Sequence, residues 1–353
     1  MPKPLAQSRI LNLDGLRCVA ILLVIIGHLR YNQAPLNNPS NILRLIASFG
    51  SMGVDIFFAI SGFLITNRLL SEWVRDGSIS LKAFYLRRIF RLFPALIAFL
   101  LFLTVLSNFG WINVSQGEIF ASAFFYRNFY TGPSGWFTAH FWSLAVEEHY
   151  YLIFPALLLV GLKKGWNLRG FLAISSFVLI IWQGFDRCFS NPLGFSGLDP
   201  HTRSDYRMLS LFAGALAGVR WTTGRGLNYR SKKQEMLVLV AISILFIVFL
   251  KAKIGLEELW RPFILAEIVA LVVNLGDNPV VSWFEWPPIT WIGRISYSLY
   301  LWQQVFLIPY ELRSNFKWEH FSINLSLVFV MAAFSYYLIE KPFVRVGHRI
   351  ASC

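Results

Sequence analysis

Charged side chains are scarce in this chain of 353 residues: 14% of the residues are charged, whereas 56% are hydrophobic and 17% are aromatic. The mean hydropathy of +0.54 is too high for a soluble domain of this length. Cysteine is rare as well, and Cys18, Cys188 and Cys353 lack the spacing of metal ligands, so we expect no metal site. Cys18 and Cys353 fall on the predicted cytoplasmic side and Cys188 on the opposite side, so we expect no disulfide. Repeats, low-complexity tracts and long linkers are also lacking, which predicts one membrane domain over residues 1–353 without an appended soluble domain.

Long apolar runs recur from one end of the chain to the other, and each is close to the length that crosses a bilayer as a helix. They predict an all-α, polytopic membrane protein with about ten transmembrane helices in one bundle. The predicted spans are 18–33, 52–70, 92–108, 141–162, 171–186, 206–221, 235–250, 259–275, 292–309 and 321–339. A shorter apolar piece at 118–130 contains Arg127, and we interpret it as re-entrant or interfacial, with an eleventh span as the alternative.

Basic residues indicate the orientation of these spans. If both termini are cytoplasmic, 21 of the 32 Lys and Arg residues fall on the cytoplasmic side, as the positive-inside rule requires. The net charge of +13 then predicts contact with lipid headgroups, and no nucleic-acid partner, because no long soluble basic domain exists. The first apolar run lacks a small-residue cleavage site, so we expect no cleavable signal peptide.

The first span contains two ionisable residues in the segment LDGLRCVAILLVIIGHLR. In a helix, Arg17 and His28 share one face and lie about 16 Å apart along the axis. If Arg17 lies at one interface, His28 therefore lies near the middle of the membrane. Ionisable groups at that depth face a protein interior or a water-filled cavity and indicate a functional site. The alternative is a capping arginine and a core histidine bonded to a backbone carbonyl.

Two further segments place charges in or beside predicted spans. GVDIFFAISGFLI contains Asp55, a carboxylate that could orient the imidazole of His28, or else a solvated group at a helix N-terminus. FYLRRIFRLFP gathers three guanidinium groups at the cytoplasmic start of the third span, where they would suit a phosphorylated ligand or anionic lipid; these are Arg87, Arg88 and Arg91.

The segment FWSLAVEEHYYLIFP places adjacent carboxylates inside an apolar stretch, and Ser143 lies one helical turn before Glu147. Near the C-terminus, GRISYSLYLWQQ contains Tyr297, for which anchoring at the membrane interface is the alternative to a functional role.

Taken together and in this order, LDGLR with its later histidine, GVDIFFAISGFLI, YLRRIFRLFP, FWSLAVEEHYYL and ISYSLYLW resemble the acyltransferase-3 family of integral-membrane O-acyltransferases. The resemblance implies transfer of an acyl group, acetyl by default, from cytoplasmic acyl-CoA to a hydroxyl of a carbohydrate acceptor. That acceptor would be a surface polysaccharide or a lipid-linked sugar, and the site would be in a bacterial cytoplasmic (inner) membrane. Acyl-CoA would be a co-substrate, and no permanently bound cofactor is expected.

The family's motifs fall on particular residues of this chain. The resemblance implies that the family's essential arginine and histidine are Arg17 and His28. It places the family's basic motif on Arg88 and Arg91, and its Trp-Ser…Glu motif on Trp142, Ser143 and Glu147. Members often have a histidine after the Leu-Trp of the ninth-span motif, whereas this chain has Gln303, to which we assign no proton transfer.

The chemistry of these residues agrees with that reading. His28 would act as general base, with Asp55 or Glu147 orienting it, while Arg17, Arg87, Arg88 and Arg91 would hold the coenzyme A phosphates. Trp142, Ser143 and Tyr297 would contact the acceptor or support the site. Two alternatives stay open: the same chemistry on a macrolide or other glycosylated natural product, and a polytopic transporter or flippase.

Overall fold

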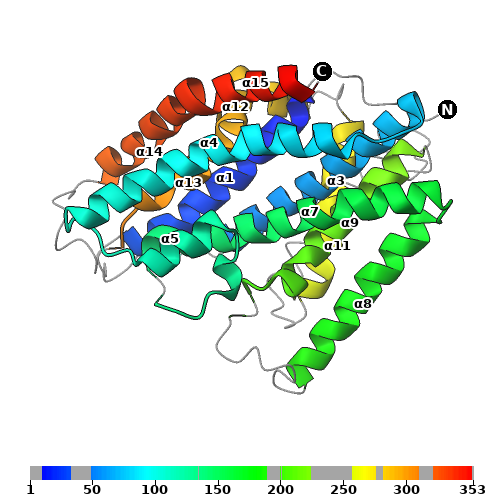
Figure 1. Cartoon of the computed structure of the whole chain (residues 1–353), viewed down its shortest axis with the longest axis horizontal. Coiled ribbons are helices and arrows are strands. Elements are labelled where there is room, and N and C mark those ends of the chain that lie inside the picture. Colours follow the sequence, from blue (N-terminus) through cyan, green and yellow to red (C-terminus); the bar gives the residue numbers. More distant parts are fainter. Residues whose placement is uncertain are drawn as a thin grey trace. The chain divides into compact units, whose positions relative to one another are not determined.

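The computed structural model describes residues 10–32, 49–133, 135–188, 199, 201–223, 257–275, 281–309 and 321–351. Every regular element within these residues is a helix (Figure 1). The longer α-helices are α1 (Leu11–Asn32), α3 (Gly50–Asp76), α4 (Leu81–Asn108), α7 (Phe141–Lys163), α8 (Leu168–Cys188), α9 (Ser204–Thr222), α11 (Glu257–Asn274), α13 (Ser296–Phe306), α14 (Phe321–Ser335) and α15 (Lys341–Ala351). The short helices are α5 (Gln116–Ala123), η1 (Arg127–Phe129), α6 (Trp136–Ala139), η2 (Ser282–Glu285), α12 (Pro287–Arg294) and η4 (Tyr336–Glu340).

The all-helical prediction is confirmed, and 6 of the described helices are long and apolar enough to cross a membrane. These stretches are Leu11–Leu29, Gly50–Asp76, Leu81–Asn108, Trp136–Lys163, Leu168–Asp186 and Asn324–Ala351. The predicted spans 206–221 and 259–275 are helical, as α9 and α11, whereas 292–309 is divided between α12 and α13. The predicted span 235–250 lies outside the described residues.

The piece at 118–130 does not form an eleventh span. It contains most of α5, which has 8 residues, and the three-residue helix η1. At about 1.5 Å per residue, neither element approaches the thickness of a bilayer. A capping box between Ser115 and Glu118 fixes the beginning of α5.

The chain divides into two compact units. Unit 1 contains the described parts of 1–18, 55–79 and 146–293, and unit 2 those of 19–54, 80–145 and 294–353. Helices α1, α3 and α7 each contribute residues to both units.

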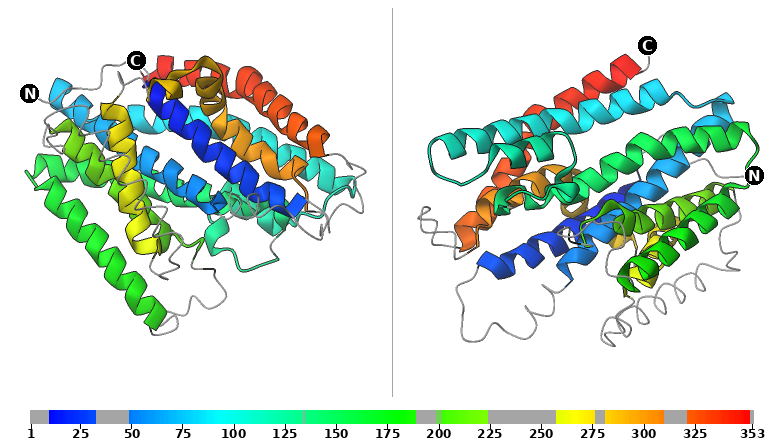
Figure 2. Two further views of the ribbon diagram at one scale, coloured as in Figure 1. Left: turned by 180° about the vertical axis from the view of Figure 1, so that it is seen from behind. Right: turned by 60° about the horizontal axis from the view of Figure 1, so that its bottom comes forward.

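In unit 1, α9 packs against both α8 and α11, shown in green and yellow in Figure 2. Helices α3 and α9 run in the same direction, because Asp55 meets Arg207 near their N-terminal ends and Asn67 donates to Thr222 near the other end of α9. Their backbones approach so closely that a Cβ atom on Gly214 would clash with the carbonyl oxygen of Ala59. Glycine is therefore required at this crossing.

In unit 2, α15 runs alongside α4, and α13 packs against α14 (Figure 1). The serine cap of α4 is Ser80, whose side chain accepts a hydrogen bond from the backbone of Ala83 at 3.2 Å. Between α14 and α15 the chain makes a π-helical turn, η4, which ends at the buried Glu340. Ser298 of α13 donates to that carboxylate at 3.1 Å, which links α13 to the turn.

Candidate active site

His28 lies on α1 between two glutamine side chains of α13. Its Nδ1 atom is 3.1 Å from Oε1 of Gln303, and its Nε2 atom is 3.3 Å from Nε2 of Gln304. The indole of Trp136 meets the imidazole edge-on, with ring centroids 5.4 Å apart. All four residues belong to unit 2.

The arrangement of these amides defines the tautomer of His28. Because the amide oxygen of Gln303 can only accept, Nδ1 carries the proton and donates it. Nε2 then holds a lone pair, which accepts from the amide group of Gln304. The result is a neutral imidazole with a fixed orientation and one basic nitrogen.

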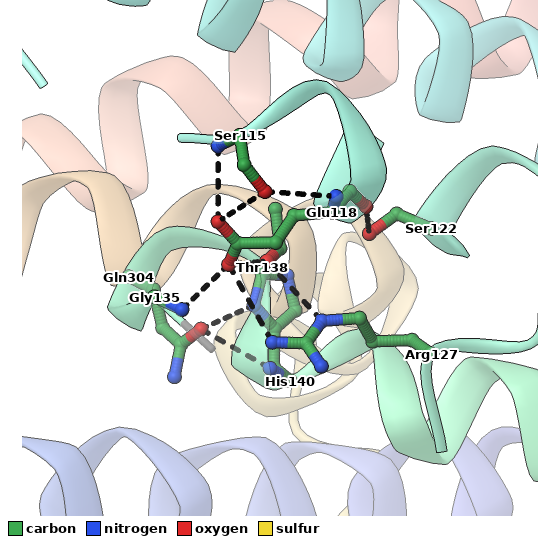
Figure 3. Close-up of polar contacts among 8 residues, drawn as sticks. All are labelled: Ser115, Glu118, Ser122, Arg127, Gly135, Thr138, His140 and Gln304. Carbon is green, nitrogen blue, oxygen red and sulfur yellow. Dashed lines mark hydrogen bonds and ion pairs between the residues drawn. The ribbon is translucent and has the colours of Figure 1, made fainter. Parts of the chain in front are cut away.

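Gln304 also connects His28 to a second histidine. Its Oε1 atom accepts from the backbone N–H of His140 at 3.3 Å and from Nδ1 of the same residue (Figure 3). The hydrogen bonds therefore run in one direction, from His140 through Gln304 and His28 to Gln303. The Nε2 atom of His140 is buried and has no hydrogen-bond partner within the described part of the chain.

The backbone carbonyl of His140 is held from two sides. Ser143 and Tyr300 each donate to it at 3.0 Å, and their hydroxyl oxygens lie 2.5 Å apart. The ring of Phe99 packs edge-on against the imidazole of His140. These contacts fix the position of His140, and they give Ser143 a structural role beside it.

A buried ion pair positions the segment before His140 (Figure 3). Glu118 accepts from the backbone of Gly135 at 2.5 Å and from Thr138 at 3.0 Å, and it lies 3.5 Å from a guanidinium nitrogen of Arg127. Burial lowers the pKa of Arg127, and the charge of Glu118 acts in the opposite direction. Arg127 also donates to Thr138 at 3.3 Å, so the cluster ties α5, η1 and α6 together ahead of α7.

Asp55 has charged partners of its own in unit 1. It lies 3.2 Å from a guanidinium nitrogen of Arg207 and 2.7 Å from one of Arg261, and it accepts from Ser210 at 3.2 Å. Glu147 accepts from Ser61 at 2.8 Å, and Tyr151 donates to the same hydroxyl at 3.0 Å. Ser61 therefore has a polar role in addition to its small size. The predicted orienting role of Asp55 or Glu147 toward His28 stays a prediction.

The remaining predicted residues lie on helices of one unit or the other. Arg17 is half-buried in unit 1 and pairs with Asp14 at 3.3 Å. In unit 2, Tyr297 donates to the backbone carbonyl of Leu92 at 3.0 Å, which joins α13 to α4. The other half-buried residues of unit 2 on this list are Arg87, Arg88, Arg91 and Trp142, and Arg88 lies over the ring of Phe84.

Three residues of the site were missed or given no role in the sequence analysis: His140, Gln303 and Gln304. The available signal was a pair of amides in an otherwise apolar segment, and a histidine directly before the Trp-Ser motif. Cys18 and Cys188 are free thiols, whereas Cys353 lies outside the described residues. Across the described residues, no three His, Cys, Asp or Glu side chains gather in a metal-binding group.

Comparison with known proteins identifies relatives of this chain. The chain is 28% identical to peptidoglycan O-acetyltransferase OatA of Listeria monocytogenes over 95% of this chain and 56% of that protein. It is 30% identical to a protein of Staphylococcus aureus that is provisionally named an O-acetyltransferase, over 95% of this chain and 57% of that protein. It is 27% identical to YrhL of Bacillus subtilis, provisionally named a peptidoglycan O-acetyltransferase, over 96% of this chain and 55% of that protein.

The chain thus spans a little over half the length of the curated relatives it matches. No solved structure matches it. The family described as "Acyltransferase domain" matches residues 10–340. This range includes the His28 cluster, which comprises His28, Trp136, His140, Gln303 and Gln304. The chain belongs to the acyltransferase-3 family.

Proposed function

We propose that this chain is an integral-membrane O-acyltransferase that moves an acetyl group from acetyl-CoA to a hydroxyl of a carbohydrate acceptor. The observation that carries the proposal is the neutral His28, held on a membrane-spanning helix with Nδ1 bonded to Gln303 and a lone pair on Nε2. The names of the relatives favour a glycan of the peptidoglycan type as acceptor. The bacterial cytoplasmic membrane is the compartment in which such a glycan precursor and acetyl-CoA are both accessible.

His28 is the general base in this scheme. Attack on a thioester by a hydroxyl requires that the hydroxyl proton be removed, and Nε2 of His28 is the atom that can accept it. Gln303 stabilises the orientation of the ring by accepting from Nδ1. The amide of Gln304 occupies Nε2 before the acceptor arrives, so the acceptor hydroxyl takes its place on that nitrogen.

The basic residues suit the donor. Arg17, Arg87, Arg88 and Arg91 would bind the phosphates of coenzyme A through charge-assisted hydrogen bonds. Arg17 and His28 lie on the one helix α1 and are separated along its axis by about 16 Å. The pantetheine arm, about 15–20 Å long when extended, matches this separation and would place the thioester beside His28.

The acyl group passes directly to the acceptor in this scheme. Ser143 donates to the carbonyl oxygen of His140 and contacts Tyr300, so its hydroxyl is engaged in structure. An acyl-enzyme would require a nucleophile paired with a base. In direct transfer the acceptor oxygen bonds to the acyl carbon, the C–S bond of the thioester breaks, and coenzyme A leaves as a thiol with the proton that His28 removed from the hydroxyl.

The test uses the purified chain in nanodiscs with radiolabelled acetyl-CoA and a crude envelope-glycan extract. We expect label to move into the glycan, His28→Ala to lower the rate by about 10²- to 10⁴-fold, and Arg88→Ala chiefly to raise the KM for acetyl-CoA. Ser298→Ala, on the same helix as the glutamines, is the matched control. If acetyl-CoA neither binds nor turns over with any extract, the proposal fails.

A further inference from the structure

His140 contains a buried polar atom that has no role in the reaction proposed above. The residue lies directly before α7, and its side chain is 2% exposed. Its Nδ1 atom donates to Oε1 of Gln304, because an amide oxygen can only accept (Figure 3). In the neutral imidazole Nε2 then holds a lone pair. That atom is buried and has no hydrogen-bond partner among the described residues.

Several hydrogen-bond donors lie close to His140, and they are engaged elsewhere. The hydroxyl groups of Ser143 and Tyr300 each donate to the backbone carbonyl of His140 at 3.0 Å. The indole N–H of Trp136 donates to the backbone carbonyl of Gln304 at 2.8 Å. A buried acceptor without a partner is unfavourable, and a donor on a bound ligand would offset that cost.

The ring of His140 is held in one orientation. It meets the rings of Phe99 and Tyr300 edge-on, with centroids 5.8 and 5.4 Å away, and it packs against Phe141 at 4.7 Å. Together with the bond to Gln304, these contacts fix the direction of the lone pair on Nε2. A ligand that donates to this atom would therefore bind without a further loss of side-chain freedom in His140.

The amide of Gln304 places His140 close to the predicted base. Its nitrogen lies 3.3 Å from Nε2 of His28, and its oxygen bonds to Nδ1 of His140. Since the two ends of an amide are about 2.2 Å apart, these two ring nitrogens lie within about 8 Å of each other. A sugar residue with its substituents spans a comparable distance, so one ligand can contact both histidines. In the topology that the basic residues predict, the beginning of α7 faces away from the cytoplasm, the side from which an acceptor would approach.

We propose that Nε2 of His140 accepts a hydrogen bond from a hydroxyl or an amide N–H of the glycan acceptor. This second contact would hold a neighbouring hydroxyl of the same glycan on Nε2 of His28. The inference rests on the proposed function for the word acceptor, while the contact itself rests on the nitrogen that has no partner.

Two substitutions separate the roles of the two ring nitrogens of His140. In His140→Asn the side-chain amide nitrogen takes the place of Nδ1 and can still donate to Gln304, but no acceptor remains at Nε2. In His140→Gln the amide oxygen takes the place of Nε2, and the bond to Gln304 is lost. The matched control is His348→Asn, at an exposed histidine of α15 in the same unit.

The measurement is the Kd of the purified chain in nanodiscs for the disaccharide N-acetylglucosaminyl-N-acetylmuramic acid, and separately for coenzyme A. Both follow from the rise of the unfolding temperature with ligand concentration. We expect the Kd for the disaccharide to rise about tenfold in His140→Asn, as the loss of one hydrogen bond predicts. In His140→Gln and His348→Asn it should stay within about threefold of the wild type. The Kd for coenzyme A should not change in any variant.

A second readout requires no substitution of His140. The chain has six histidines, so ¹⁵N-histidine labelling of the wild type gives few ring-nitrogen signals, and His28→Ala identifies that of His28. The disaccharide should shift the signals of two unprotonated ring nitrogens, one from His28 and one from His140. A shift at His28 alone would contradict the proposal even if His140→Asn does not fold.

The proposal is also overturned if the disaccharide does not bind the wild type, or if folded His140→Asn binds it as the wild type does. Equal weakening in His140→Asn and His140→Gln would overturn it as well, because the bond to Gln304 or the packing would then be the cause. Weaker binding of coenzyme A alone would assign the nitrogen to the donor instead. None of these readings requires turnover. Failure of the proposed function is seen separately, as a wild type that binds the disaccharide but releases no coenzyme A from acetyl-CoA.

Discussion

The His28 cluster and the Asp55 cluster, which comprises Asp55, Arg207, Ser210 and Arg261, stabilise polar side chains among apolar helices in opposite ways. Among the described residues, the side-chain partners of His28 are neutral: two amides, an indole and, through Gln304, a second imidazole. Around Asp55 the partners are two guanidinium groups and a hydroxyl. The first arrangement leaves Nε2 of His28 as a basic nitrogen that can accept a proton. The second holds the charged carboxylate of Asp55 in place.

This difference has a physical cause. A buried carboxylate beside an imidazole would favour the charged imidazolium, which can no longer accept a proton. An amide oxygen orients the same ring without adding charge. Gln303 is therefore a partner that keeps His28 ready to act as a base. Asp55 instead requires cations, since an unpaired buried charge is strongly destabilising.

The largest effect is expected where charge is removed from the Asp55 cluster. Asp55→Asn removes the buried carboxylate with which Arg207 and Arg261 both pair, so we expect a loss of about 3–5 kcal/mol in the free energy of unfolding. The unfolding temperature in nanodiscs measures this change. Asp76→Asn, in the exposed pair with Arg75, is the control and should leave that temperature unchanged. An Asp55→Asn variant as stable as the wild type would remove the contrast between the clusters.

An intermediate effect is expected where the series of hydrogen bonds from His140 to Gln303 is interrupted. Gln304→Leu removes the amide that holds His140 against α13; the second bond of this amide, to Nε2 of His28, is already given up when the acceptor arrives. Because the bond to His140 is lost, we expect kcat to fall about tenfold, the equivalent of one hydrogen bond of about 1.4 kcal/mol, with the KM for acetyl-CoA unchanged. Steady-state release of coenzyme A measures both constants. If Gln304→Leu changes only the unfolding temperature, the amide is purely structural.

The smallest effect is expected from exchanging one neutral partner for another. In Gln303→His, a ring nitrogen can accept from Nδ1 of His28 as the amide oxygen does, so activity should stay within about twofold of the wild type. Gln303→Leu offers no acceptor and should lower kcat by several-fold, or about 1 kcal/mol. The comparison of the two variants separates the loss of an acceptor from the loss of side-chain volume. Equal activity of both would show that Nδ1 needs no partner.

Sequence patterns predicted the helical fold, and they placed Arg17 and His28 on one helix at different depths of the membrane. They could do so because the length of an apolar run and the spacing of residues along a helix are local properties. They also singled out Asp55 and Glu147 as carboxylates that need partners. They could not identify the partners themselves. Arg207 is 152 positions from Asp55, and Gln303 is 275 positions from His28, so these contacts depend on how distant helices pack.

The role of Gln303 shows this limit most clearly. As a replacement for a titratable histidine in a family motif, it offers no proton chemistry of its own. Its function becomes visible only through its distance of 3.1 Å from Nδ1 of His28. His140 was overlooked for a similar reason, since a histidine beside aromatic residues resembles an ordinary core residue until its bond to Gln304 is seen.

Chemical rescue of His28→Ala tests the central claim most directly, that the imidazole of His28 removes the acceptor proton. The measurement is the rate of coenzyme A release from acetyl-CoA by the folded variant, with and without added imidazole. The claim predicts a large loss of activity that imidazole partly restores, with a rate that rises as free imidazole becomes unprotonated with increasing pH. A folded His28→Ala variant that turns over at the wild-type rate without imidazole would contradict it.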